Sequence, residues 1–256
     1  MSASPDDKII YDRKIVRRKT SVAFSLFVLF FGLAGFGWFQ LKNAPKEQGK
    51  KGIQIPLRGV LDANEAVFSS VFSSSDRAKE FPFEEAVKKP RVNGKIGLGK
   101  DFDADYWKLI VIRTTGDTLL LTLEDIQKLP KTEITFDFKC IEGWSQVTNW
   151  GGVKFSDFIR ACNLTEEAAL GYIGLVTPDG DYYVGIDMAS ALHDQTLLCY
   201  EMNRKPLPAD QGYPLRLIIP VKYGIKSLKR IGTLSFSNER PKDYWFEKGY
   251  DYYSGM

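Results

Sequence analysis

The sequence predicts a mixed α/β domain that follows a single membrane-spanning helix. From residue 106 onward, short apolar strand patterns alternate with short helical patterns. Ahead of them, residues 20–41 form a run of 22 residues without a charge, and about 20 apolar residues suffice to cross a bilayer core as a helix. The composition, 44% hydrophobic and 26% charged, is ordinary for a domain that folds in water.

The N-terminal region divides by composition into three parts. Residues 1–19 are a charged tail that we expect in the cytoplasm, residues 20–41 are the anchor, and residues 42–60 are a linker containing Lys, Gln, Gly and Pro. Trp38 stands where aromatic side chains favour the membrane–water interface. The apolar run lacks the small-residue exit of a cleaved signal peptide, so we predict an uncleaved signal-anchor.

The pair Arg17-Arg18 stands directly before the apolar run, as in twin-arginine export signals. Lys-Thr-Ser-Val follows at residues 19–22, where a Phe-Leu-like pair would strengthen that interpretation. Basic residues flank both ends of the anchor, with only a slight excess on its N-terminal side. The pair therefore fits either an export signal or a simple topological signal.

One domain is expected within residues 61–256. Residues 64–85 carry four phenylalanines among serines and charges, which fits either a docking helix or an irregular segment that wraps the domain. Beyond them, β-branched and aromatic runs predict strands, whereas an acidic start and apolar residues at helical spacing predict helices. The predicted strands are residues 107–112, 119–123, 135–139, 172–177, 182–186, 215–219 and 229–236, and the predicted helices are residues 123–129 and 155–162. Residues 178–181, Pro-Asp-Gly-Asp, predict a turn.

Several classes of function are disfavoured. The net charge of +3 comes from Lys and Arg scattered among Asp and Glu, without the basic stripe of a nucleic-acid-binding protein. The single histidine, His193, cannot form the His clusters of most zinc or iron sites, and its context predicts a turn with a structural or surface role. Neither a Gly-x-Gly-x-x-Gly motif nor a P-loop is present.

The three cysteines are odd in number, so they cannot form a complete disulfide framework. Cys162 and Cys199 lie in apolar helical and strand patterns and are predicted to be buried core thiols. Cys140 stands at a strand end, where reactive groups are often presented. Next to Lys139, its thiol is compatible with a nucleophile, a redox sensor, a soft metal ligand or an inert buried group.

An ordered series of motifs extends from residue 91 to residue 229. It comprises Arg91-Val-Asn-Gly94, Cys140-Ile-Glu-Gly-Trp-Ser145 with Trp150-Gly-Gly-Val-Lys-Phe155, Leu197-Leu-Cys-Tyr-Glu-Met-Asn203 with Pro206-Leu-Pro208, Gly212-Tyr-Pro-Leu-Arg216, and Pro220-Val-Lys-Tyr-Gly-Ile-Lys-Ser-Leu-Lys229. In this order the motifs resemble the sulfite oxidase superfamily of molybdopterin enzymes, and most closely the bacterial branch that includes the periplasmic protein-methionine-sulfoxide reductase catalytic subunit.

The resemblance implies a sulfite-oxidase-type core with mixed sheets that binds molybdopterin, the mononuclear molybdenum cofactor. One protein thiolate completes the metal site in such enzymes, so Cys140 is the implied metal ligand and catalytic residue. Tyr182 is the second implied catalytic residue, although Tyr183 is an alternative match. The residues implied to bind the cofactor are Asn93, Cys140, Thr177, Gln211, Arg216, Gly224, Lys226 and Lys229.

The residues after Cys140 bear on the substrate. Sulfite-oxidising members carry arginines there to receive an anion, whereas residues 141–145 are Ile-Glu-Gly-Trp-Ser. We therefore expect two-electron oxygen-atom transfer, with reduction of an S- or N-oxide favoured over sulfite oxidation. Residues 61–256 leave no length for a haem domain or an immunoglobulin-like dimerisation domain, so a separate haem electron carrier is expected.

The expected location is the inner membrane, in a single pass, with the catalytic domain on the periplasmic side. Arg204 replaces a glycine common in this family, which keeps a second hypothesis open: a catalytically inactive, membrane-tethered binding module of the same fold. A third hypothesis is a thiol redox protein in which Cys140 pairs with Cys162 or Cys199.

Overall fold

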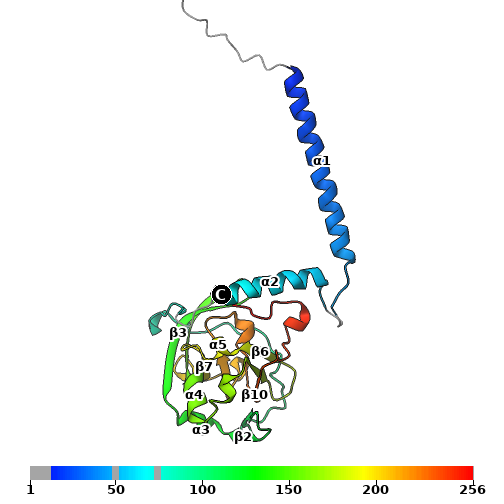
Figure 1. The fold of residues 1–256 in the computed structure, drawn as a ribbon. Helices are drawn as coiled ribbons and strands as arrows, with labels where there is room; N and C mark the ends of the chain where they lie inside the picture. The colour runs from blue at the N-terminus through cyan, green and yellow to red at the C-terminus, as the bar shows by residue number, and fades with distance from the viewer. Residues whose placement is uncertain (1–12, 48–51, 72–75, 256) are drawn as a thin grey trace, which may run out of the picture. The chain divides into compact units, whose positions relative to one another are not determined.

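The computed structural model describes residues 13–47, 52–71 and 76–255 (Figure 1). They fall into two compact units. The first contains the described residues of Met1–Gln48 and Ile53–Arg58, and the second contains those of Gly49–Gly52 and Gly59–Met256. The expected tail at residues 1–19 lies largely outside the described residues.

The first unit contains one long helix and a short closed loop. Helix α1 (Arg13–Asn43) is long and apolar enough to span a membrane, and it extends the predicted anchor at both ends. After it, the Ile55 N–H donates to the Pro45 carbonyl at 2.9 Å and the Glu47 N–H donates to the Ile53 carbonyl at 3.0 Å. Arg58 forms an ion pair with Glu47 at 2.6 Å. The chain therefore returns on itself soon after α1 ends.

Helix α2 (Ile55–Val71) begins inside the segment expected to be a linker. Pro56 is compatible with this start, because the first turn of a helix does not need its N–H. Both alternatives for residues 64–85 occur in part. The helix continues to Val71. From residue 76 the chain is irregular, and the Phe81 N–H donates to the Thr135 carbonyl at 2.9 Å. The 3-10 helix η1 (Phe83–Glu85) follows.

The second unit is built on two five-stranded sheets. The first has the order β2-β1-β10-β5-β6, from β1 (Leu109–Ile112), β2 (Thr118–Leu121), β5 (Tyr172–Val176), β6 (Tyr183–Asp187) and β10 (Thr233–Ser237). It is mixed, because β1 and β10 are parallel while the other neighbours are antiparallel. The second has the order β3-β4-β7-β8 with β9 also beside β7, from β3 (Lys131–Lys139), β4 (Ser145–Lys154), β7 (Leu197–Met202), β8 (Lys205–Pro206) and β9 (Arg216–Ile218), all antiparallel.

Apolar side chains from both sheets share one core. Leu109, Ile173 and Leu234 of the first sheet pack in the same cluster as Val153 and Leu217 of the second. Short helices connect the strands: α3 (Leu123–Gln127), α4 (Phe155–Ala161), α5 (Met188–Ala191), and the 3-10 helices η2 (Glu167–Ala169), η3 (Ala209–Gln211), η4 (Gly224–Lys226) and η5 (Phe246–Lys248). This is the mixed α/β class that the sequence predicts.

Two predicted elements differ from the structure in a way that matters for the site. β4 was not predicted, because its sequence, Ser-Gln-Val-Thr-Asn-Trp-Gly-Gly-Val-Lys, lacks a strong apolar alternation, yet it lies between β3 and β7. The strand predicted at residues 229–236 starts only at Thr233. Before it, Arg230 has φ 52°, which breaks the extended conformation and leaves Lys229 in a loop.

Candidate functional site

Cys140 lies at the turn between β3 and β4, which form a long antiparallel hairpin with Lys139 opposite Ser145. The Cys140 N–H donates to the Trp144 carbonyl at 2.9 Å, and its carbonyl accepts from the Gly143 N–H at 3.0 Å. Gly143 has φ 87°, a left-handed conformation that glycine adopts without strain. The hairpin therefore presents the thiol in a tight loop, where it is 8% exposed.

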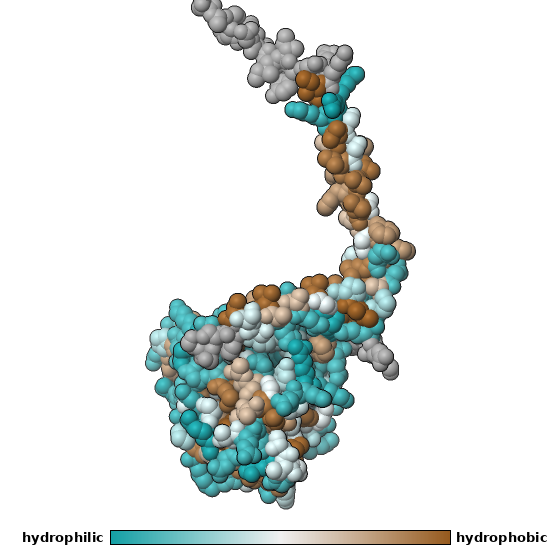
Figure 2. Space-filling model, viewed as in Figure 1, coloured by the Kyte–Doolittle hydropathy of each residue, from teal (hydrophilic) through white to brown (hydrophobic). Residues whose placement is uncertain are grey.

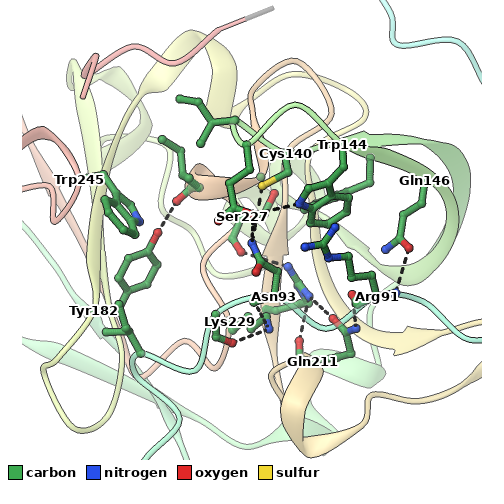
Figure 3. Close-up of a pocket in the computed structure, with 18 of the residues that line it drawn as sticks. Arg91, Asn93, Cys140, Trp144, Gln146, Tyr182, Gln211, Ser227, Lys229 and Trp245 are labelled. Atoms are coloured by element: carbon green, nitrogen blue, oxygen red, sulfur yellow. Dashed lines mark hydrogen bonds between the residues drawn. The ribbon is translucent and has the colours of Figure 1, made fainter. Parts of the chain in front are cut away.

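A pocket opens at this thiol (Figure 3). Tyr182 and Trp245 lie on one side, Trp144 and Arg91 lie on the other, and Cys140 lies between them. The complete lining is Arg91, Asn93, Gly94, Ile96, Phe138, Cys140, Ile141, Glu142, Trp144, Gln146, Trp150, Tyr182, Gln211, Arg216, Gly224, Ile225, Ser227, Lys229, Trp245 and Tyr250. Six segments of the chain thus converge on one cysteine, at residues 91–96, 138–150, 182, 211–216, 224–229 and 245–250.

Asn93 joins the thiol to the neighbouring carboxylate. Its Nδ2 lies 3.7 Å from the Cys140 Sγ and donates to the Glu142 Oε2 at 3.2 Å. The Trp144 Nε1 donates to the same Glu142 oxygen at 3.1 Å. The guanidinium of Arg91 lies 4.6 Å from the centre of the Trp144 ring. A fixed negative charge therefore lies at the pocket, two residues from the thiol.

Arg216 is the most deeply buried cation of the pocket, at 2% exposure. It donates to the Gln211 carbonyl at 2.9 Å and to the Ser227 carbonyl at 3.1 Å, and it stacks 4.5 Å from the Trp150 ring centre. Burial lowers the pKa of Arg216 to about 10, so it is still cationic at neutral pH. Among the described residues, its Nε and the hydroxyl of Ser227 are buried polar atoms without a hydrogen-bond partner.

Lys229 holds the pocket loop in place. Its ammonium donates to the carbonyls of Asn93 at 2.8 Å, Gly94 at 3.1 Å and Asp210 at 2.9 Å. Burial, followed by the positive charge of Arg216, lowers the pKa of Lys229 to about 7. An anion bound beside this group would raise that pKa again.

Tyr182 is the other predicted catalytic residue at the pocket. Its hydroxyl donates to the Ile225 carbonyl at 2.6 Å. Burial, and then the charge of Asp243, raises the pKa of Tyr182 above the usual value, so the phenol stays neutral. The alternative residue, Tyr183, instead donates to Glu247 and does not line the pocket.

Seven of the nine predicted site residues line this pocket: Asn93, Cys140, Tyr182, Gln211, Arg216, Gly224 and Lys229. Gly224 lies against an aromatic ring, since a Cβ there would come within 2.6 Å of Phe138. Lys226 and Thr177 lie outside it. Lys226 points into the core and pairs with Asp243 at 2.6 Å, while Thr177 donates to Asp179 at 2.6 Å within the turn that follows β5.

Sequence reasoning missed Ser227, Trp245 and Tyr250. Ser227 lies between two predicted cofactor residues but has an unremarkable side chain. Trp245 and Tyr250 belong to an aromatic segment, residues 244–253, that carries none of the matching motifs. The density of aromatic residues there is the one signal that could have drawn attention to it.

The described residues contain no group of three or more His, Cys, Asp or Glu side chains placed to hold a metal ion. At this pocket the chain offers a metal the thiolate of Cys140, a soft ligand.

Comparisons with known proteins point to the same region. The family model described as "Oxidoreductase molybdopterin binding domain" matches residues 97–245. The putative protein-methionine-sulfoxide reductase subunit YedZ1 of Azospira oryzae is 34% identical over 72% of this chain and 67% of its own length. The protein-methionine-sulfoxide reductase catalytic subunit MsrP of Campylobacter jejuni is 34% identical over 59% of this chain and 55% of its own length.

Two further proteins are similar over shorter shares of their length. Mitochondrial sulfite oxidase of Rattus norvegicus is 30% identical over 60% of this chain and 33% of its own length. The crystal structure of the sulfane dehydrogenase SoxCD from Paracoccus pantotrophus has 18% identity and a TM-score of 0.49, covering 55% of this chain and 40% of that chain. The family model covers more than half of the chain and includes the cysteine at the centre of the pocket. This chain therefore belongs to the oxidoreductase molybdopterin-binding domain family, in the sulfite oxidase superfamily, and is a molybdenum-dependent oxidoreductase that uses a molybdopterin cofactor.

Proposed function

We propose that this chain is a membrane-anchored reductase that removes an oxygen atom from an S- or N-oxide and exchanges electrons with a separate haem protein. The observation that carries the proposal is the pocket at Cys140, where the charged residue that follows the cysteine and lines the pocket is Glu142 rather than an arginine. Two relatives are named as subunits of protein-methionine-sulfoxide reductases, which supports both the substrate class and a partner protein.

The residues of the pocket fit the cofactor of the family. The unpartnered Arg216 Nε and Ser227 hydroxyl are buried and line the pocket, so they are available to a ligand with oxygen or nitrogen acceptors. A pterin that ends in a phosphate has such acceptors, and cations suit its phosphate. When bound, the molybdenum group supplies two-electron oxygen-atom exchange. We propose Cys140 as its protein ligand, held by Asn93, and Arg216, Ser227 and Gln211 as donors to its organic part, with Lys229 contributing its positive charge and holding the pocket loop.

Lys226 and Thr177 have different roles in this proposal. Lys226 is 1% exposed and its charge is neutralised by buried Asp243. The hydroxyl of Thr177 is used within its own turn. We assign both to positioning: Lys226 supports the adjacent pocket residues Ile225 and Ser227, and Thr177 supports the start of the strand that follows Tyr182.

The walls of the pocket favour a neutral substrate. Glu142 is fixed by Asn93 and Trp144, so its negative charge would repel sulfite. Trp144, Trp245, Tyr250 and Tyr182 offer aromatic surface to an apolar group such as the methyl of a sulfoxide. Because the phenol of Tyr182 stays neutral and its proton is donated to the Ile225 carbonyl, we propose that Tyr182 forms a fixed wall of the pocket and does not act as a base.

We propose that α1 anchors the protein in the inner membrane and that the catalytic unit faces the periplasm. The uncharged run at residues 20–41 supports the anchor, and Arg17-Arg18 supports export through the twin-arginine route. Within this proposal residues 42–60, which include the first residues of α2, link the anchor to the catalytic domain at residues 61–256.

The alternative of an inactive binding module rests on Arg204, and the structure provides an explanation for that residue. Asn203 and Arg204 have φ values of 53° and 60°, as the two central residues of a tight hairpin turn between β7 and β8. The Arg204 side chain pairs with Glu133 at 2.9 Å and stacks 4.0 Å from the Phe83 ring centre. The residue does not line the pocket, so its substitution gives no reason to expect a loss of catalysis.

The full chain, expressed in a host that makes molybdopterin, tests this function. We expect molybdenum and pterin in the purified protein, and methionine sulfoxide to be reduced when a reduced dye supplies electrons. Sulfite should not be oxidised appreciably when a dye accepts them. Purified protein without molybdenum and pterin would favour the inactive module, and sulfite oxidation without sulfoxide reduction would contradict the substrate class.

A further inference from the structure

Helix α2 places charge toward the protein and apolar side chains toward the outside. Toward the protein, Glu65 forms an ion pair with Arg240 at 2.6 Å and its side chain is 12% exposed. Leu61, one turn earlier, is half-buried on the same face. Burial, offset in part by Arg240, raises the pKa of Glu65. The charged side chain of Glu65 therefore points toward the protein and not toward the outside.

The outward face is apolar apart from the exposed Asn64, which lies one turn after Val60 and one turn before Phe68. Val60 is 57% exposed, Val67 60%, Phe68 55% and Val71 68%. They follow the spacing of one broad helix face, with the exposed Ala63 between the first two. From Gly59 to Val71, all of which the structure describes, Asp62 is the one exposed residue with a charge. Figure 2 shows the resulting line of hydrophobic residues along α2.

A helix at the surface of a domain in water shows the opposite arrangement, with its apolar stripe toward the core and its charges outside. A contiguous exposed apolar surface marks a site of interaction with a partner or a membrane. The outward face of α2, defined by Val60, Ala63, Val67, Phe68 and Val71, therefore needs an apolar neighbour.

The connection to α1 restricts what that neighbour can be. Helix α1 ends at Asn43, and the Pro45–Ile55 hydrogen bond closes the chain so that α2 starts beside the residues that follow α1. The Arg58–Glu47 ion pair holds the first turn of α2 to the same short segment. A helix of 17 residues is about 25 Å long. If α1 crosses the bilayer, every residue of α2 stays within about that distance of the bilayer surface.

We propose that α2 is an interfacial helix whose outward face lies in the headgroup region of the bilayer that anchors α1. This inference rests on the anchor in the proposed function. Such helices bury their apolar face about 5–10 Å deep. The exposed Lys42, in the last turn of α1, and Lys46, between the two helices, favour anionic headgroups at the same level.

The consequence concerns the pocket. Glu65 binds Arg240, and the segment that follows Arg240 supplies Trp245 and Tyr250 to the pocket wall. Docking of α2 therefore connects the membrane, through Glu65 and Arg240, to the segment that borders the substrate site.

Photocrosslinking in the full chain tests this inference. Three variants each carry one diazirine-bearing amino acid, which replaces Phe30 in α1, Val67 on the outward face of α2, or Asp117 in the turn between β1 and β2. Each variant is reconstituted separately in vesicles of phosphatidylcholine and phosphatidylglycerol. Lipid adducts are measured by mass spectrometry after illumination. We expect adducts at positions 30 and 67 and none at position 117.

Each alternative gives its own result. Lipid adducts at position 30 without any at position 67 would overturn the inference and leave the anchor intact. Absence of lipid adducts at position 30 would overturn the anchor, and the inference with it. A crosslink from position 67 to a second copy would show a protein interface and would also overturn the inference. A lipid adduct at position 117 in the same yield as at position 67 would overturn it as well.

A charge variant provides a second readout. Val60→Glu places a charge on the outward face, and we expect it to remove most of the lipid adduct at position 67, because a carboxylate is disfavoured at that depth. Thr118→Glu, on exposed β2, is the matched control and should leave the adduct unchanged. Equal yields in the two variants would argue against insertion of the outward face.

Discussion

At the scale of the residue, the site depends on a thiol and a carboxylate that share one amide. Asn93 lies 3.7 Å from the Cys140 sulfur and 3.2 Å from the Glu142 carboxylate. The loop that carries both groups is closed by its own backbone hydrogen bonds. The roles of the two groups can therefore be separated by substitutions that leave the loop in place.

Cys140→Ser should abolish sulfoxide reduction while the domain stays folded. A hydroxyl is a poor substitute for a thiolate as a soft metal ligand, and the change removes little buried surface. Turnover with a dye donor and circular dichroism of the same preparation check this expectation. Cys199→Ser is the matched control, because Cys199 is buried, at 0% exposure, and lies outside the pocket. Full activity of the Cys140 variant with molybdenum bound would refute the ligand assignment.

Glu142→Gln should admit anions to the pocket. Loss of one negative charge a few ångströms from the substrate changes the interaction with an anion by about 1 to 4 kcal/mol, depending on solvent access. We expect the inhibition constant of sulfite or sulfate against sulfoxide reduction to fall at least about fivefold, with a smaller change in KM for the neutral sulfoxide. Glu124→Gln, in α3 and away from the pocket, is the control. An unchanged inhibition constant would show that Glu142 does not set charge selectivity.

At the scale of the element, η4 and the C-terminal segment are joined by a buried ion pair. Lys226 donates to Asp243 at 2.6 Å and to the Gly185 carbonyl at 3.0 Å. The other oxygen of Asp243 accepts from the N–H groups of Trp245 at 3.1 Å and Phe246 at 3.0 Å. The pair thus connects the pocket residues beside Lys226 to the wall residue Trp245.

Lys226→Met should destabilise the domain and raise KM more than it lowers kcat. An uncompensated buried charge costs about 3–5 kcal/mol, and release of Asp243 frees the segment that positions Trp245. Lys222→Met is a matched control, because Lys222 is equally buried and pairs with Asp187 at 2.7 Å but does not line the pocket. Denaturation and steady-state kinetics are compared in both variants. If Lys226→Met and Lys222→Met lose similar stability and change KM equally, Lys226 has no positioning role.

At the scale of the whole molecule, one pocket lysine couples stability to pH. The folded-state pKa of Lys229 is about 7, well below its ordinary value of 10.5. Below pH 7 both the folded and the unfolded chain carry the proton, and the cost of burying the charge is present in full. Between about pH 7 and 10.5 the unfolded chain binds more protons, so this group makes the domain more stable as pH rises.

Lys229→Met should remove this dependence. In the cofactor-free full chain, the difference in unfolding free energy between wild type and variant should shift in favour of wild type from pH 7 to pH 9, by less than about 1.4 kcal/mol per pH unit. Chemical denaturation in detergent at several pH values measures it. A constant difference across this range would show that Lys229 is not desolvated. Bound cofactor should suppress the effect, because its phosphate favours the charged lysine.

The sequence by itself determined the parts of this protein that depend on neighbouring residues. The uncharged run at residues 20–41 is helical in the structure, as a continuous apolar run of this length without proline predicts. The strands β1, β5 and β6 form close to their predicted places for a similar local reason. Cys140 lies at a strand end, as predicted, and the ordered motifs identified the family to which the comparisons assign the chain.

The tertiary structure decided what depends on contacts between distant residues. β4 is a strand because β3 and β7 pair with it on both sides, which its own sequence does not show. Lys226 and Lys229 are both lysines of one motif, yet one points into the core toward Asp243 and the other reaches the pocket loop. The wall residues Trp245 and Tyr250, and the direction in which α2 faces, likewise follow from long-range packing. Local patterns determine which segments are helices or strands, whereas the partner that each side chain meets is fixed only when segments far apart in the chain pack together.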